Sequence, residues 1–306
     1  MDLNEKISDK QTEGGQTALP GEKEERKLRK MLSAKRRIIL KVGSSTITHS
    51  ETGDVNLHLV EQLVRLCCDL KGQGKDVMLV SSGAIAAGRR AMNFDERPKE
   101  TPVKQALAAV GQAKLMMIYQ KLFAEYNHIA SQVLLTKFTL LNREALVNAR
   151  NTFEELFNLG SIPIINENDT VSTTEISFGD NDRLASLVAS ITGGDLVILL
   201  SDIDGLYTDD PHQNQGAEFI SFVPYIDKKL LGMAKSSSAS GLGTGGMHSK
   251  IEAARIATDA GADMLILSGS EIENVVRALS GEKIGTLFAA HKNSEFNLLK
   301  YIRDEY

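Results

Sequence analysis

Short, almost uninterrupted apolar runs alternate with helical segments from residue 37 onward, and this alternation limits the possible folds more than any other feature. The runs are RIILKVG (37–43), DVMLVSSG (76–83), IASQVLLT (129–136), IPIINEND (162–169), DLVILLSD (195–202) and DMLILSG (263–269). Strands that are apolar on both faces are typical of a parallel sheet covered by helices on both sides. We therefore expect an α/β fold, a three-layer αβα sandwich around a mostly parallel central sheet.

The segments between these runs have helical spacing of their apolar residues. This spacing predicts helices near 56–72, over 104–126, near 142–158, in 183–193 and over 247–260. No repeat and no low-complexity linker interrupts the chain after residue 37, so we expect one domain over residues 36–306. In open sheets of this kind, ligands bind at the carboxyl ends of the strands.

The first 35 residues differ from the rest of the chain. They are charged, poor in apolar residues and interrupted by Gly-Gly and Pro-Gly pairs. This composition predicts a disordered, solvated leader whose helical tendency is confined to its basic end, near 24–37. Acidic residues throughout the segment argue against a transit peptide. We assign the leader no role.

Composition excludes several classes of partner. The net charge of −5 gives no reason to expect nucleic acid. No apolar run approaches the roughly 18 residues of a membrane helix, so no membrane partner is expected. The only two cysteines, Cys67 and Cys68, are neighbours in a helical pattern. They offer neither a disulfide framework nor metal-ligand spacing, which favours a reducing, cytoplasmic location.

A glycine-rich stretch, SGLGTGGMHSK (240–250), precedes the helix expected over 247–260. It satisfies the dinucleotide pattern G-x-G-x-x-G, but no strand-like run precedes it, and it lacks the adjacent Gly and Lys of a P-loop. A glycine loop that leads into a helix presents free backbone N–H groups and the positive end of the helix dipole, which together bind anions. Lys250 would lie in the first helical turn, with its ammonium group toward the same anion. The alternative is a flexible surface loop.

Polar residues follow several of the predicted strands. The segments are KVGSST, SSGAIAAG, NENDTV and SDIDGLYTDDP. Any one of them is more often a simple turn. Because the carboxyl ends of parallel strands meet at one edge of the sheet, their repetition predicts a ligand site there. GDNDR also predicts a helix N-cap at Asp180 or Asn181.

The ordered segments KVGSSTIT, VSSGAIAAGRR, KQALAAVGQAKLM, NENDTVSTTEISFGDNDRLAS, LLSDIDGLYTDDP and SGLGTGGMHSKIEAA identify a resemblance. Together they resemble the glutamate kinase branch of the amino acid kinase family, from about residue 37 to 291. The resemblance implies the amino acid kinase fold and transfer of the γ-phosphoryl group of ATP to the side-chain carboxylate of L-glutamate, the first step of proline biosynthesis. It implies ATP as co-substrate and Mg²⁺ carried with the nucleotide, with no separate metal site on the protein.

The resemblance also implies roles for individual residues. Lys41 and Lys250 would flank the transferring phosphoryl group, and Asp182 would hold the two lysines in place. Asp180 would share that work or face the substrate. L-glutamate would meet Ser82, Asp169 and Asn181, although NEND without the family is most simply a polar turn. The nucleotide would contact Lys41, Ser201, Asp202, Thr244, Gly245, Gly246, Met247 and Lys250.

Other expectations follow from the same resemblance. Proline is expected as a feedback inhibitor, a homo-oligomer as the assembly, and the next enzyme of the pathway as a further partner. A C-terminal PUA domain, frequent in the family, is not expected in this chain, and KVGS replaces the family's usual lysine-leucine-glycine-threonine. The alternatives are a kinase of the same fold acting on N-acetylglutamate, aspartate, carbamate or UMP, or a non-catalytic amino-acid or nucleotide sensor. A sensor would be expected to lack Lys41, Lys250 or Asp182.

Overall fold

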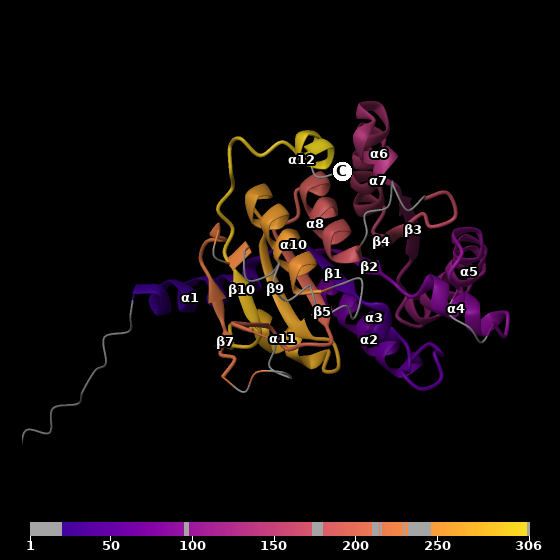
Figure 1. Ribbon diagram of the computed structural model, residues 1–306, viewed down its shortest axis with the longest axis horizontal. Coiled ribbons are helices and arrows are strands. Elements are labelled where there is room, and N and C mark those ends of the chain that lie inside the picture. The colour runs from indigo at the N-terminus through magenta and orange to yellow at the C-terminus, as the bar shows by residue number, and fades with distance from the viewer. Residues whose placement is uncertain are drawn as a thin grey trace, which may run out of the picture.

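The computed structural model describes residues 20–94, 98–172, 180–209, 214, 216–228, 230–231 and 246–304. Its centre is an eight-stranded sheet in the order β3-β4-β2-β1-β5-β9-β10-β8 (Figure 1). The strands are β1 (Arg37–Val42), β2 (Asp76–Ser81), β3 (Ala130–Leu135), β4 (Ile162–Glu167), β5 (Leu196–Ser201), β8 (Phe222–Val223), β9 (Asp263–Ser268) and β10 (Thr286–Phe288). Neighbouring strands are parallel except β9 and β10, which are antiparallel. The expected mostly parallel sheet is confirmed.

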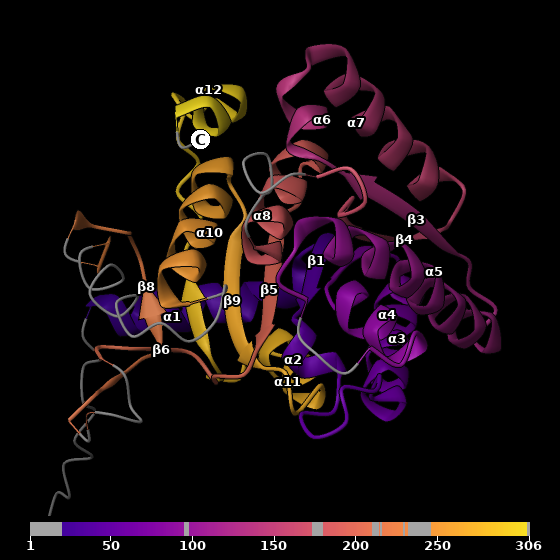
Figure 2. The same ribbon diagram turned by 45° about the vertical axis from the view of Figure 1, so that its right-hand side comes forward.

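Helices cover both faces of this sheet (Figure 2). One apolar cluster joins it to α3 (Leu57–Gly72), α4 (Ala84–Ala91), α5 (Thr101–Glu125) and α11 (Glu273–Leu279). A second joins the other face to α6 (Lys137–Leu141), α7 (Arg143–Asn158), α8 (Asn181–Thr192), α10 (Met247–Ala260) and α12 (Leu298–Asp304). The three-layer αβα sandwich is therefore confirmed. None of the described helices combines the length and apolarity needed to cross a bilayer.

Smaller elements complete the described chain. A short helix, α2 (Ser44–Ile47), follows β1, and a two-stranded sheet pairs β6 (Leu206–Tyr207) with β7 (Phe219–Ile220). The helices predicted near 56–72, 142–158 and over 247–260 agree with α3, α7 and α10 to within a residue or two at each end. α10 ends at Ala260, and the next residue, Gly261, terminates the helix with a φ of 98°, the left-handed conformation that glycine adopts readily.

The second half of the leader is helical, as its basic end predicted, but it is packed against the rest of the chain rather than solvated. Residues Pro20–Met31 form helix α1, which leads into a 3₁₀ turn, Leu32–Ala34. Arg29 of this helix is almost fully buried, and its guanidinium donates hydrogen bonds to the backbone carbonyls of Ser221, Ile284 and Gly285 at 2.8–2.9 Å. Glu25, one turn earlier, pairs with it at 2.9 Å. Residues 1–19 of the leader lie outside the described residues.

Two glycines allow α4 and α5 to pack with their backbones in contact. A Cβ atom at Gly88 would lie 1.9 Å from the carbonyl oxygen of Leu107, and one at Gly111 would lie 1.7 Å from that of Ala84. No side chain larger than hydrogen fits at either position without separating the helices. This contact matters for the site because α4 begins two residues after Ser82, and α5 carries Gln112 beside Gly111.

Candidate active site

Lys41 lies near the carboxyl end of β1 and points to the side of the sheet that α8 and α10 cover. Ile38, Leu40 and Val42 of the same strand belong to the opposite core, and successive side chains of a strand alternate between faces. The Lys41 side chain is 9 % exposed, and its Nζ lies 2.5 Å from Oδ1 of Asp182 and 4.0 Å from Oδ1 of Asp180. A buried cation on a central strand is costly unless paired, and these carboxylates pair it.

Lys250 reaches the same carboxylate from α10. Its Nζ donates to Oδ2 of Asp182 at 3.2 Å, so the two carboxylate oxygens of Asp182 face two different lysines. All three side chains are at least nine-tenths buried. Burial alone raises the pKa of the Asp182 carboxyl, but the ammonium groups of Lys41 and Lys250 outweigh this effect and hold the pKa below its ordinary value. The Asp182 carboxylate is therefore ionised and pairs with both ammonium groups.

Of the two N-cap candidates predicted from the sequence, Asp180 and Asn181, it is Asp180 that caps α8. Its Oδ1 accepts a hydrogen bond from the Asp182 backbone N–H at 3.0 Å, which fixes the start of the helix. Its other oxygen, Oδ2, is buried without a hydrogen-bond partner among the described residues. Because a buried carboxylate oxygen is normally satisfied, this atom is available to a donor or cation of a bound ligand.

The residues predicted to meet the amino-acid substrate form two groups. Ser82 and Asn181 are in direct contact, because Nδ2 of Asn181 donates to the Ser82 hydroxyl at 2.7 Å. Asn181 also donates to Oδ1 of Asn166 at 2.9 Å, and Asn166 donates to Oε1 of Gln112 at 3.0 Å. Asn181 adjoins Asp182 in the first turn of α8, so this polar group borders the buried lysines.

Asp169 follows β4 and is half-buried close to the buried side chain of Glu167. Burial, with a smaller contribution from the Glu167 carboxylate, raises the pKa of Asp169 to about 6. Glu167 in turn accepts a hydrogen bond from the Ser172 hydroxyl. A carboxyl group with so high a pKa favours a positively charged partner, because such a partner relieves the cost of its burial.

The residues predicted to contact the nucleotide are only partly described. Ser201, at the end of β5, is buried and donates to Asp202 at 2.9 Å, and its carbonyl accepts from the N–H of Gly269 after β9. Met247 begins α10 and Gly246 precedes it, with no side chain capping the helix. Thr244 and Gly245 lie outside the described residues. The first backbone N–H groups of α10 therefore point out of its N-terminal end, and no described side chain caps them.

Asn166, Glu167 and Gln112 were not among the predicted site residues. Asn166 and Glu167 belong to the NEND segment, one of the polar segments from which the ligand site was predicted, and both are buried. Nothing in the sequence around Gln112 indicated a site residue, because it occurs in a helix whose apolar spacing resembles that of a core helix.

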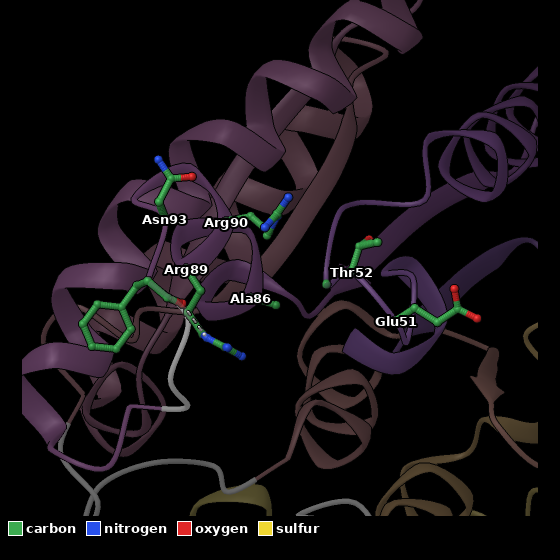
Figure 3. A pocket seen from close by; sticks show the side chains of 8 residues that line it. Glu51, Thr52, Ala86, Arg89, Arg90 and Asn93 are labelled. Atoms are coloured by element: carbon green, nitrogen blue, oxygen red, sulfur yellow. Dashed lines mark hydrogen bonds between the residues drawn. The ribbon is translucent and has the colours of Figure 1, made fainter.

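A cavity of about 370 Å³ also opens between α4 and the turn after α2 (Figure 3). It is lined by Glu51, Thr52, Gly53, Ala86, Arg89, Arg90, Asn93 and Phe94, none of which is a predicted site residue.

Comparison with known proteins assigns this fold to one class. The sequence pattern of the amino acid kinase family matches residues 36–268. The chain belongs to the amino acid kinase family. Solved structures of UMP kinases share the fold: that from Bacillus anthracis aligns with a TM-score of 0.56 at 13 % identity over 84 % of this chain and 96 % of its own. The one from Ureaplasma parvum aligns with a TM-score of 0.55 at 12 % identity, over 83 % and 99 %.

Within this family, the sequence is similar to proteins named glutamate 5-kinase. The relative from Carboxydothermus hydrogenoformans is 49 % identical over 88 % of this chain and 72 % of its own length. The relative from Clostridium acetobutylicum is also 49 % identical, over 85 % of this chain and 96 % of its own length. That from Clostridium perfringens is 44 % identical, over 87 % and 99 %. The resemblance seen in the sequence motifs is therefore confirmed.

Proposed function

We propose that this chain catalyses the ATP-dependent phosphorylation of the γ-carboxylate of L-glutamate, which yields γ-glutamyl phosphate and ADP, the first step of proline biosynthesis. The observation that carries the proposal is the pairing of two buried lysines, Lys41 and Lys250, with one carboxylate, Asp182. The similarity to glutamate 5-kinases over most of the chain supports the choice of acceptor.

The chemistry accounts for these residue types. A carboxylate is already ionised at neutral pH, so its oxygen can attack the γ-phosphorus without a general base. One P–O bond forms to the glutamate carboxylate, the bond to the β-phosphate oxygen breaks, and ADP leaves. Both reactants are anions, so catalysis consists mainly of positioning them and neutralising charge. Lys41 and Lys250 supply that charge, and Asp182 holds the two ammonium groups together against their mutual repulsion.

The remaining residues bind and orient the reactants. The first turn of α10 and the end of β5 contact the nucleotide, whose phosphates are attracted by uncapped N–H groups. Mg²⁺, when bound with ATP, neutralises phosphate charge, and the unpartnered Oδ2 of Asp180 is the described carboxylate oxygen suited to face it. Ser82, Asn181 and Asp169 hold the glutamate, with the carboxylate of Asp169 pairing with the α-ammonium group.

Trapping with hydroxylamine tests this function. The acyl phosphate is unstable, and hydroxylamine converts it to a stable hydroxamate as it forms. Purified protein with MgATP is expected to form hydroxamate from L-glutamate and not from L-aspartate or N-acetyl-L-glutamate. Formation with another acceptor in preference to glutamate would refute the proposal. Folded protein that binds ATP yet forms no hydroxamate with any of the three would favour the sensor alternative.

L-Proline is expected to weaken the binding of L-glutamate. Proline carries the same α-carboxylate and a secondary ammonium group, so the side chains that hold the substrate backbone can hold it as well. In a competition titration, the apparent Kd for glutamate should rise linearly with proline concentration. Pyrrolidine, which lacks the α-carboxylate, is the control and should leave that Kd unchanged at the same concentration. Glutamate affinity that does not change with proline would exclude shared binding.

Glutamate affinity is expected to depend on pH through Asp169, whose pKa is about 6. Above pH 6 the carboxylate is ionised and pairs with the α-ammonium group of the substrate, whereas protonation below pH 6 removes that charge. The Kd for L-glutamate measured by calorimetry should therefore be about tenfold higher at pH 5 than at pH 7.5. The Asp169→Asn variant should bind weakly with little change between these values. An equal pH dependence in this variant would assign the titration to another group.

A further inference from the structure

A chain of three side-chain amides leads from helix α5 to the substrate side of the site. Gln112 on α5 accepts a hydrogen bond from Asn166 at the end of β4, and Asn166 accepts one from Asn181 at the start of α8. We infer that Gln112 is a positioning residue: it fixes the amide orientation of Asn166, and through it that of Asn181, so that the site selects substrates with a free ammonium group. This inference rests on the proposed function, whose substrate preference it explains.

The orientation of the Asn181 amide is determined by the two hydrogen bonds that its NH₂ group donates. An asparagine amide has one NH₂ group with two hydrogens and one acceptor oxygen. The NH₂ group of Asn181 gives one hydrogen to the Ser82 hydroxyl at 2.7 Å and the other to Oδ1 of Asn166 at 2.9 Å. Its oxygen has no hydrogen-bond partner among the described residues. Asn181 therefore presents an acceptor to whatever binds beside it.

This orientation depends on Asn166. If the amide of Asn166 rotated by half a turn, its NH₂ group would meet the NH₂ group of Asn181, and two donors would face each other. Asn181 would then have to rotate as well, and it would present donors to the ligand. Asn166 is 4 % exposed, so water does not substitute readily for its partners. The acceptor that holds Asn166 in place is Oε1 of Gln112, at 3.0 Å.

We therefore expect the site to prefer a ligand group that carries several hydrogen-bond donors. An ammonium group has three hydrogens to donate, and in the proposed binding mode it meets the Asn181 oxygen as well as the Asp169 carboxylate. A dicarboxylate without the amino group, such as glutarate, leaves both acceptors without a partner, and unpaired buried polar groups are costly. A site that has lost this orientation would discriminate less between L-glutamate and glutarate.

Substitutions at Gln112 separate the role of its oxygen from its role in packing. Gln112→Met keeps the length of the side chain and removes the acceptor. Gln112→Glu keeps an acceptor and cannot offer a donor, so it imposes the same orientation on Asn166. We expect Gln112→Met to raise KM for L-glutamate about tenfold, with kcat and KM for ATP within about twofold of wild type, and Gln112→Glu to restore the wild-type KM.

The decisive measurements are binding titrations of L-glutamate and glutarate, without nucleotide, to wild type and both variants. The ratio of the two Kd values should fall about tenfold in Gln112→Met and remain near the wild-type value in Gln112→Glu. If Gln112→Glu behaves like Gln112→Met, or if the methionine variant weakens both ligands equally, the amide chain does not set selectivity. Wild type that binds glutamate without phosphorylating it refutes the proposed function alone. Wild type that does not bind glutamate refutes both.

Discussion

Replacing Lys250 with methionine is expected to lower kcat for phosphoryl transfer to glutamate by about 10²- to 10³-fold while the protein remains folded. The loss follows from the removal of one of two cations beside the transferring group. The fold should survive because Asp182 keeps its partner Lys41, 2.5 Å away, and no buried carboxylate is left without a cation. The measurement is single-turnover hydroxamate formation at saturating MgATP, with thermal unfolding recorded on the same preparation.

Lys121→Met, on the exposed side of α5, is the matched control and should retain wild-type kcat. Asp182→Asn provides a contrast, because it leaves two buried ammonium groups facing a neutral amide. That variant should lose activity and also about 3–5 kcal/mol of unfolding free energy. A Lys250→Met protein with normal kcat and only weaker ATP binding would assign Lys250 to nucleotide affinity rather than to the transferring phosphoryl group.

Replacing Gly111 with alanine is expected to reduce the free energy of unfolding by about 3 kcal/mol. The added Cβ would lie 1.7 Å from the Ala84 carbonyl oxygen and 2.4 Å from the Gly88 backbone nitrogen, so α4 and α5 must move apart. Alanine is the better helix former by about 1 kcal/mol, which offsets only part of this cost. Denaturant titration should show the loss, and KM for glutamate should rise because Gln112 moves with α5.

Gly72→Ala is the matched control for this effect. Gly72 is the last residue of α3, it is exposed, and a Cβ there would meet nothing within 4 Å. The same chemical change should therefore be neutral or slightly stabilising at this position. Equal destabilisation by the two substitutions would mean that the close approach of α4 and α5 does not limit the residue at 111.

The sequence predicts the parts of this molecule that depend on local pattern. The apolar runs become β1 to β5 and β9 because a covered parallel strand needs little besides continuous hydrophobicity. The limits of α10 and the N-cap at Asp180 follow from single residues, Gly261 and Asp180 itself. The edge strand β8 and its neighbour β10 were not predicted, because a segment of two or three residues is too short to show a strand-like pattern.

Features that depend on distant contacts could not be predicted in the same way. The buried guanidinium of Arg29 bonds to carbonyls more than 190 residues away, and nothing in the charged leader indicates such partners. Gln112 contacts a residue on another element and resembles any polar position of a long helix. Lys41, Lys250, Asp180 and Asp182 lie together because each is near the end of a strand or the start of a helix at the same edge of the sheet. Asn166 and Gln112, which form the hydrogen-bond chain with Asn181, could be identified only from the three-dimensional structure.

The contacts of helix α1 determine which N-terminal truncations of the chain keep the sheet intact. The family pattern begins at residue 36, and a fragment designed on that boundary would lack Arg29 and Glu25. The carbonyl groups of Ser221, Ile284 and Gly285 would then lose the donor that ties β8 and β10 together from outside the sheet. A fragment that begins before Pro20 keeps these hydrogen bonds. One that begins at residue 36 leaves the carbonyl groups beside the edge strand β8 and its neighbour β10 without this donor, and they could then pair with other chains and promote aggregation.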